Sequence, residues 1–354
     1  MFVFLLLLKD KQKSRTMKKI IIPIAAIALF FASCGNNEAP KQEVAEVNDN
    51  QTTFDQASKM FAVLPSEAPN PENPLTDEKV ELGKKLYLDK RLSKDETQSC
   101  NTCHDLANYG VDNQPTSAGN NGGLGTRNSP TSFNAALHGT QFWDGRNKDV
   151  EEQAGGPILN PVEMEMPDEA SVIARIAADE EYVALFAKVY PDEEDPISYK
   201  NITWAIGAFE RTLLTPAPFD AYLEGDQTAL SQEQIDGLKV FMDEGCTVCH
   251  NGALLGGNMF MKFGIYTDYW TLTNSNPIDS GKYVVSHNDA DLFVFKTPSL
   301  RNIEKTYPYF HDGSVKDLGE AVKIMAKTES NKDLSDEQTE SIVTFLASLT
   351  GELK

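Results

Sequence analysis

Two copies of one five-residue motif constrain this chain more than any other feature. The first is Cys100–His104 (CNTCH) and the second is Cys246–His250 (CTVCH). The spacing C-x-x-C-H is the attachment pattern of c-type haem: two thiols bond to the vinyl groups of one porphyrin, and the adjacent histidine binds the iron. The motifs therefore predict two covalent haems. The first would be held by Cys100, Cys103 and His104, and the second by Cys246, Cys249 and His250.

Two other uses of paired cysteines are alternatives here. A zinc site would recruit both pairs together and leave the two histidines without a role. A redox-active dithiol does not require histidine as its next residue. The remaining cysteine of the five, Cys34, lies outside both motifs. Two complete haem motifs in one chain therefore favour haem over either alternative.

The N-terminus reads as an export signal. Met17-Lys18-Lys19 is a basic start, Ile20 to Phe31 is an apolar run of signal-peptide length, and the run ends just before Cys34. The stretch 31–35 (FASCG) resembles a bacterial lipoprotein cleavage box, in which Cys34 becomes the lipidated first residue. A transmembrane anchor is the alternative. Residues 1–34 are predicted to be this signal, and residues 35–60, which are mostly polar, a flexible tether.

The haem motifs lie within a longer internal duplication. Each follows a short amphipathic stretch, 75–87 before the first and 230–242 before the second, and the two stretches align from Leu75 and Leu230. Ser231 and Gln234 form a capping box at the start of the second stretch. Apolar residues then recur at helical spacing. Each haem motif is therefore predicted to follow an amphipathic helix.

The duplication continues after the motifs. Segment 130–152 aligns without a gap on 298–320, so that Asn134 matches Asn302 and Phe142 matches Phe310. Helical periodicity also covers 169–189, 201–214 and the stretch after the capping box at Ser335, whereas 283–285 and 293–295 are possible short strands. These patterns predict a mainly α fold with two cytochrome-c-like haem domains, 61–214 and 215–354.

Composition narrows the class of partner. The chain has 354 residues and a formal net charge of −21, with 53 acidic against 32 basic side chains. Nucleic-acid binding requires clustered Lys and Arg, and no such cluster follows residue 20. An acidic surface instead favours association with a basic protein.

The two copies differ in the residues that could act as a sixth iron ligand or as an acid/base. The second copy offers Met325, and a thioether is a good sixth ligand that raises the haem potential. The first copy offers Gln153 and then Glu163 in the sequence Pro161-Val162-Glu163-Met164. A glutamate above an iron with an open position suits proton transfer on a bound peroxide. A core methionine and a solvated loop glutamate are the structural alternatives for Met325 and Glu163.

Five motifs together resemble the bacterial dihaem cytochrome c peroxidases, over roughly Met60 to Gly351. They are CNTCH at 100–104, QFWDGR at 141–146, VEM at 162–164, TPSLRN at 297–302 and YFHDGS at 309–314. The resemblance implies a low-potential peroxidatic haem in the first domain and a high-potential haem, through which electrons enter, in the second.

The resemblance also implies roles for individual residues. His104 would be the proximal ligand of the first haem, and His250 and Met325 the ligands of the second. Glu163 would be the acid/base, with Gln153 beside it, and Trp143 would lie between the haems on the electron route. A calcium ion would sit at the domain interface, a hard cation held by oxygen atoms of Asn128, Thr306 and Pro308.

One departure from the family pattern concerns the resting state of the first haem. Many members place a histidine after the glycine of the segment 117–120, where it caps the iron until the other haem is reduced. This chain has Asn120 there. A carboxamide is a poor ligand to ferric haem, so the first iron is expected to rest open or water-bound. His138, the nearest spare imidazole in the sequence, is an alternative cap.

These inferences predict an enzyme that reduces hydrogen peroxide with electrons from a small redox protein, a cytochrome c or a cupredoxin. It would lie in the periplasm, anchored by lipid at Cys34, and by family analogy form a homodimer. Two alternatives remain. A dihaem electron carrier would need His138, Met164 or Met166 as a sixth ligand of the first haem. A related protein-oxidising dihaem enzyme uses Tyr where this chain has Met325.

Overall fold

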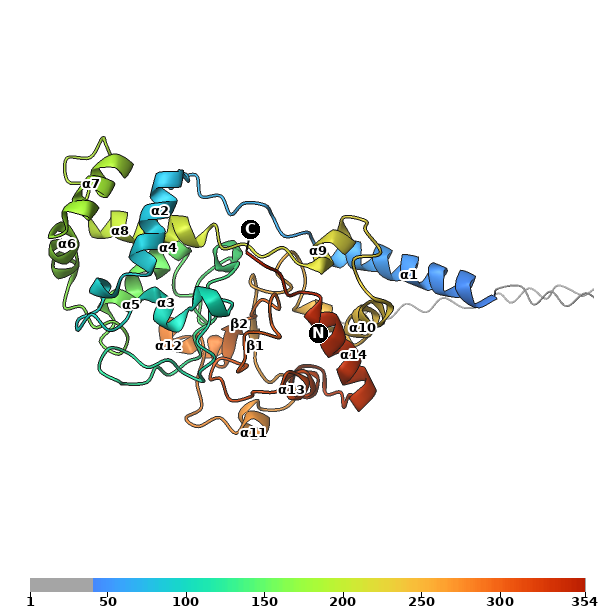
Figure 1. Ribbon diagram of the computed structural model, residues 1–354. Helices are drawn as coiled ribbons and strands as arrows, with labels where there is room; N and C mark the ends of the chain where they lie inside the picture. Colours follow the sequence, from blue (N-terminus) through green and yellow to red (C-terminus); the bar gives the residue numbers. More distant parts are fainter. Residues whose placement is uncertain (1–40, 354) are drawn as a thin grey trace, which may run out of the picture. The chain divides into compact units, whose positions relative to one another are not determined.

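The computed structural model describes residues 41–353, with side chains from residue 49 onward (Figure 1). The predicted export segment and Cys34 lie outside the described residues. From Ala45 onward the chain forms one compact unit. The fold is mainly helical, as predicted, with the elements α1 Lys41–Met60, α2 Asp77–Tyr87, α3 Cys100–Cys103, α4 Val150–Gln153, α5 Gly155–Leu159, α6 Glu169–Ala177, α7 Glu180–Val189, α8 Tyr199–Glu210, α9 Pro218–Leu223, α10 Gln232–Asp243, β1 Phe260–Lys262, α11 Trp270–Thr273, α12 Tyr283–Ser286, β2 Val294–Lys296, α13 Leu318–Ser330 and α14 Asp336–Ala347.

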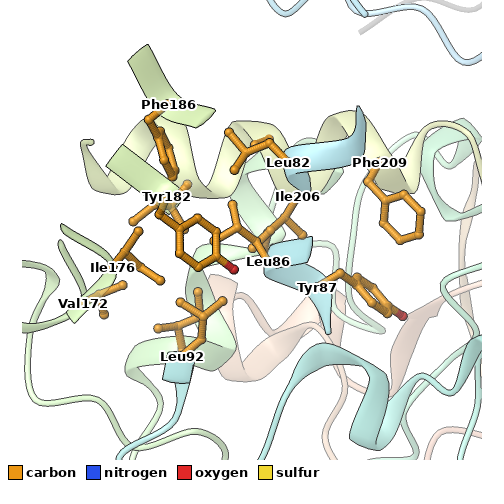
Figure 2. Packing of buried hydrophobic residues seen from close by; sticks show 14 of the residues in the cluster. Leu82, Leu86, Tyr87, Leu92, Val172, Ile176, Tyr182, Phe186, Ile206 and Phe209 are labelled. Carbon is orange, nitrogen blue, oxygen red and sulfur yellow. The ribbon is translucent and has the colours of Figure 1, made fainter. Parts of the chain in front are cut away.

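The first haem module is built around the contact of α2 with α8. Thr76 begins α2 by accepting a hydrogen bond from Lys79 N at 3.2 Å. Leu82 and Leu86, one helical turn apart, are fully buried against Ile206 of α8 (Figure 2). Helices α6 and α7 close the other side of this core. The core therefore fixes the helix that precedes the first haem motif.

The second module repeats this arrangement with α10 and α14. The capping box of Ser231 and Gln234 is present at the start of α10, as predicted. Leu238 and Phe241 of α10 are buried against Phe345 of α14. The two haem motifs thus follow equivalent helices, each packed on a late helix of its own module.

Two glycines, Gly83 and Gly237, allow the two helices of each pair to approach closely. Their equivalence also shows that the alignment of the two amphipathic stretches is shifted by one residue. A Cβ on Gly83 would lie 1.8 Å from Ala205 O, and a Cβ on Gly237 would lie 2.0 Å from Ser341 O. Gly83 and Gly237 are therefore structural equivalents. The sequence alignment that starts at Leu75 and Leu230 instead pairs Leu82 with Gly237. It matches the two N-cap residues, but it cannot detect that the two helices differ by one residue after the cap.

Gly83→Ala is expected to lower the free energy of unfolding by at least about 1–3 kcal/mol, because the added methyl group would force α2 away from α8. Denaturant unfolding of the holo-protein measures this. Gly156→Ala in α5 is the control, since its Cβ would meet only Phe142 Cζ at 3.7 Å. Equal unfolding midpoints for Gly83→Ala and the wild type would contradict the close helix crossing.

Backbone geometry confirms the duplication in the loops. Asn134 and Asn302 share a left-handed conformation, with φ of 60° and 59°, and Phe142 and Phe310 do so with φ of 66° and 69°. Both asparagine amides donate to the same oxygen, Thr215 Oγ1, at 2.7 and 2.9 Å. Thr215 therefore joins the two repeats at the position where the sequence divides them.

The structure tests three local predictions, of which two are wrong in part or in full and one is confirmed. The continuous periodicity of 169–189 is split into α6 and α7 because Asp179 caps α7, accepting from Glu181 N at 2.8 Å. The possible strand at 283–285 is helical (α12), with Val284 and Val285 exposed and unable to pack as a sheet face. The possible strand at 293–295 is present as β2, which pairs antiparallel with β1.

The flexible tether predicted for 35–60 is wrong for the part whose side chains are described. That part lies in α1 and packs on the second module, not on the first module that follows it. Ala57 is fully buried, and the Phe54 ring meets Tyr222 edge-on at 5.4 Å. These two residues follow the polar stretch 36–53 and lie three apart on one helix face, where they pack against the second module. Among the described residues, no helix has both the length and the apolar character needed to cross a membrane.

Candidate active site

The first haem motif forms a one-turn helix, α3. Ser99 N donates to Thr102 Oγ1 at 3.0 Å at its start, and the Tyr87 hydroxyl of α2 donates to His104 O at 2.7 Å at its end. Cys100 and Cys103 are free thiols. Tyr87 thus connects the helix core to the motif and holds the backbone at His104.

A cavity of about 950 Å³ opens beside this motif. This volume lies near the upper end of the range of about 300–1,000 Å³ usual for ligand sites, so it is suited to a large cofactor. Cys100, Cys103 and His104 line it together with polar side chains from both modules. The free thiols, the histidine and the cavity together fit a covalently bound haem. The other residues that line the cavity include Arg127, Asn128, Trp143, Arg146, Gln153, Glu163, Met164, Ile206, Glu210, Ile278 and Asp279.

Glu163 lines the same cavity, so the structure brings it together with the first haem motif. Burial raises the pKa of its carboxyl, although Arg146 and Asn160 oppose the shift. Asn160 Nδ2 donates to Glu163 Oε1 at 3.0 Å and orients the group. The solvated-loop alternative does not describe this environment. A carboxyl with a raised pKa, aimed by one hydrogen bond, is suited to take up and release a proton.

Gln153 and Trp143 also line the cavity. Gln153 is the last residue of α4. Trp143 Nε1 donates to Asn128 O at 2.9 Å, and Trp143 O accepts from Lys296 N of β2 at 2.8 Å. The indole also meets the His311 ring edge-on, with 6.4 Å between centroids. Trp143 and His311 are equivalent in the duplication, so the two repeats touch through the same position.

Asn120 is fixed among polar neighbours. Its Oδ1 accepts from Asp95 N at 3.0 Å and Thr97 Oγ1 at 3.1 Å, and its Nδ2 donates to Asp95 Oδ2 at 2.8 Å and Glu165 Oε2 at 3.2 Å. Its backbone N donates to Glu163 O at 2.6 Å. The segment 117–120 is therefore tied to the loop of Glu163.

The other possible ligands of the first iron lie elsewhere. His138 is absent from the cavity lining, and its Nδ1 lies 3.0 Å from Lys296 Nζ. Met166 packs in the core of the first module. Met164 also belongs to that core, although it lines the cavity. Of these three residues, His138 and Met166 therefore lie outside the cavity lining, and Met164 lies in its wall.

The second haem motif begins with a 3₁₀ turn, Cys246–Val248, whose Val248 is 69% exposed. His250 is buried, and its Nδ1 lies 2.9 Å from Leu255 O. That bond fixes the ring and leaves Nε2 for a metal. Desolvation lowers the pKa of both His250 and His104, which keeps the rings neutral, as iron ligation requires.

Met325 is half-buried on α13. Glu329, one turn further along the same face, is close enough to Cys249 to raise the pKa of that thiol after the larger effect of burial. Met325 and Glu329 therefore share a face of α13, and the charge of Glu329 acts on the second motif. Within residues 41–353, no three His, Cys, Asp or Glu side chains converge on a point that could hold a metal, so the shared zinc site is not supported.

The predicted calcium ligands lie on adjacent segments. Asn128 N donates to His311 O at 2.7 Å, which places Asn128 beside the end of the segment containing Thr306 and Pro308. Asn113 Nδ2 donates to Tyr307 O at 2.6 Å and joins the same two regions. Asn128 Nδ2 donates to Gln114 O at 2.9 Å, which leaves its Oδ1 as the atom able to ligate a cation.

Sequence reasoning missed two polar groups of the cavity. Arg127 pairs with Asp279 and Asp144, with N–O distances of 2.6 Å to each, and spans the two modules. Glu210, at the end of α8, is buried in the cavity wall. The sequence does contain a sign of Glu210, because the equivalent position of the second repeat is Leu346. This equivalence between Glu210 and Leu346 appears only when the two repeats are aligned through Gly83 and Gly237.

Fold and site together indicate a c-type haem protein of two related modules, in which the cavity beside the first motif carries buried acids. Residues 77–228 match the family described as di-haem cytochrome c peroxidase, and residues 234–350 match cytochrome c. The chain is 45% identical over 336 residues to the cytochrome c551 peroxidase of Pseudomonas aeruginosa, covering 94% of this chain and 92% of the relative. It is 43% identical over 291 residues to the protein of the same name from Nitrosomonas europaea, covering 82% and 84%.

A solved structure supports the same fold. The crystal structure of a MauG-like protein associated with microbial copper homeostasis superposes with a TM-score of 0.73 at 29% identity, covering 82% of this chain and 94% of that one. The chain belongs to the bacterial dihaem cytochrome c peroxidase family. It is an oxidoreductase that acts on peroxide, and members of this family carry two c-type haems.

Proposed function

We propose that Cys100, Cys103 and His104 hold a peroxidatic haem, and that Glu163 handles protons for the reduction of hydrogen peroxide to two waters. The observation that carries this proposal is the presence of Glu163 in the same cavity as the first haem motif. The reaction consumes two protons and two electrons for each peroxide. The haem supplies the redox chemistry when bound.

Glu163 performs the proton transfer in this proposal. Its raised pKa allows the carboxyl to take a proton from one peroxide oxygen and to return it to the other, which leaves as water. Asn160 holds the carboxyl in position through the 3.0 Å hydrogen bond. Gln153 lines the same cavity, which supports a role in orienting peroxide by hydrogen bonding.

Electrons enter through the second haem, held by Cys246, Cys249, His250 and Met325. Trp143 supports this route because it belongs to the first module and contacts β2 and His311 of the second. The donor is a small redox protein, a cytochrome c or a cupredoxin. The net charge of −21 favours a donor with a basic surface.

The first iron is proposed to rest without a side-chain cap. All the polar atoms of the Asn120 amide are engaged by Asp95, Thr97 and Glu165, and His138 lies outside the cavity lining. Electron paramagnetic resonance of the fully oxidised protein should therefore show one high-spin and one low-spin ferric haem. Turnover should then begin without prior reduction. Two low-spin haems would contradict the open site and favour the electron-carrier alternative.

Three further features belong to the proposal. A calcium ion would be held between the modules by Asn128 Oδ1 and the carbonyls of Thr306 and Pro308. The N-terminal segment would export the chain to the periplasm, where Cys34 would carry the lipid. The family also suggests a homodimer. Mass measurement of the mature N-terminus tests the lipid, and metal analysis of the purified protein tests the calcium.

A further inference from the structure

The buried carboxyl of Glu210 has no role in the chemistry described so far. Glu210 ends α8, lines the first haem cavity with Cys100 and Ile206, and is 7% exposed. Its Oε2 is buried and has no hydrogen-bond partner among the described residues. Leaving a buried acceptor unsatisfied costs about 1–3 kcal/mol, more when it is charged.

The internal duplication shows that the fold does not require an acid at this position. Since Gly83, Ala205 and Phe209 correspond to Gly237, Ser341 and Phe345, Glu210 corresponds to Leu346. Leu346 is buried in the core of the second module. The same helix position therefore carries an apolar residue beside one haem motif and an unpartnered carboxyl beside the other.

The charges around Glu210 do not neutralise it. The acid whose charge acts on Glu210 is Glu151 of α4, which pairs with Arg211 at 3.1 Å and accepts from Asn73 Nδ2 at 3.0 Å. Tyr87 of α2 and Cys100 of α3 are the titratable groups that face Glu210 from the other packed elements. Burial, and then Glu151, raise the pKa of Glu210 to about 8. In the described part of the chain, no cation is paired with Glu210.

We propose that Glu210 is the redox-linked proton-binding residue of the first haem. The inference rests on the proposed attachment of that haem at Cys100 and Cys103. The ferric porphyrin carries one positive charge more than the ferrous form, so it favours the carboxylate. When one electron reduces the iron, the carboxylate takes one proton from solvent and becomes a neutral carboxylic acid.

This coupling has a consequence for the enzyme. An ionised Glu210 stabilises the oxidised first haem and lowers its reduction potential, because local charge and burial are among the factors that set haem potentials. The second haem, with Leu346 at the equivalent position, lacks this influence. Part of the difference between the two potentials would then come from one buried side chain in the cavity wall.

The test is a spectroelectrochemical titration of both haem potentials in the holo-protein between pH 6 and 9. The first-haem potential of the wild type should fall as pH rises, approaching a tenfold change per pH unit, about 59 mV for one electron. Glu210→Gln should remove this slope and raise the potential at alkaline pH. The second-haem potential serves as an internal reference and should not change with the substitution.

Two further variants secure the assignment. Glu163→Gln, which removes the cavity acid proposed for proton transfer in turnover, should keep the slope. If the slope vanishes in this variant but survives in Glu210→Gln, the proposal is overturned. Glu210→Leu, which introduces the residue type of the second repeat, should behave as Glu210→Gln and replaces it if the amide variant fails to fold. Potentials are measured without peroxide, so their outcome is independent of whether Glu163 is the acid/base of turnover.

Infrared difference spectroscopy gives a separate readout. Reduction of the first haem in the wild type should produce a band from a newly protonated carboxyl group. That band should be absent in Glu210→Gln and in Glu210→Leu. A wild-type spectrum without the band would overturn the proposal, even if neither variant can be purified.

Discussion

Glu163→Gln is expected to lower kcat for peroxide reduction by about 10²–10⁴-fold, the contribution typical of one positioned acid/base group. The amide keeps the shape of the side chain but cannot take or return a proton. Steady-state turnover with a reduced small cytochrome c as donor measures the effect. The haem absorption spectrum and the resting spin states should stay unchanged, because the substitution leaves His104 untouched.

The control for this variant is Glu67→Gln, which removes one negative charge from an exposed position. It should turn over peroxide at the wild-type rate. Because burial raises the pKa of Glu163, the wild-type rate should also depend on pH above the ordinary range of a glutamate, and this dependence should be lost in Glu163→Gln. Turnover by Glu163→Gln at the wild-type rate would exclude Glu163 as the acid/base.

Asp220→Ala is expected to lower the free energy of unfolding by about 3–5 kcal/mol, because it leaves a buried arginine without its partner. Asp220 Oδ1 and Oδ2 each accept from Arg301 at 2.7 Å, and Arg301 is 1% exposed. The same carboxylate accepts from Leu64 N at 2.7 Å and Ala217 N at 2.8 Å. One side chain therefore joins the chain before α2, the start of α9 and the segment after β2.

Urea unfolding of the holo-protein measures this loss. Asp243→Ala is the control, because Asp243 forms an exposed pair with Lys239 at 2.9 Å and such pairs contribute about 0–1 kcal/mol. Similar unfolding midpoints for Asp220→Ala and Asp243→Ala would contradict a stabilising role of the buried pair.

The pH dependence of stability gives a second check on Asp220. Burial opposes ionisation of its carboxyl, but hydrogen bonds from Arg301 prevail and lower the pKa below the ordinary value. A lowered folded-state pKa gives stability that is present at neutral pH and is lost as the pH falls through the acidic range. The variant should show a weaker acid dependence than the wild type.

Local sequence patterns predicted much of this molecule because they depend on neighbours in the chain. The C-x-x-C-H motifs, the capping boxes at Ser231 and Ser335 and the helical periodicity of 77–87 involve residues within one or two turns of each other. Side-chain caps and covalent haem attachment depend only on residues that are this close in the sequence. The predicted haem attachment at the two motifs stays a prediction, supported by free thiols at both motifs and by the cavity at the first.

Where local patterns failed, a distant partner decided the outcome. The segment 49–60 looks polar and flexible by composition, yet Phe54 and Ala57 find an apolar surface on a module more than 150 residues later in the chain. The one-residue shift in the alignment of the two amphipathic helices is likewise apparent only from the tertiary contact of Gly83 with Ala205 O. Periodicity reports which face of a helix is apolar, but not what covers that face.

The sequence by itself determined the mainly helical fold, the internal duplication, the two haem motifs and the family resemblance, because each depends on residue type and spacing. Only the tertiary structure decided that Glu163 shares a cavity with the first motif, that Asn120 is engaged by Asp95 and Glu165, and that Glu210 is buried without a partner among the described residues. Burial and the resulting shifts in proton affinity depend on segments that meet only after folding.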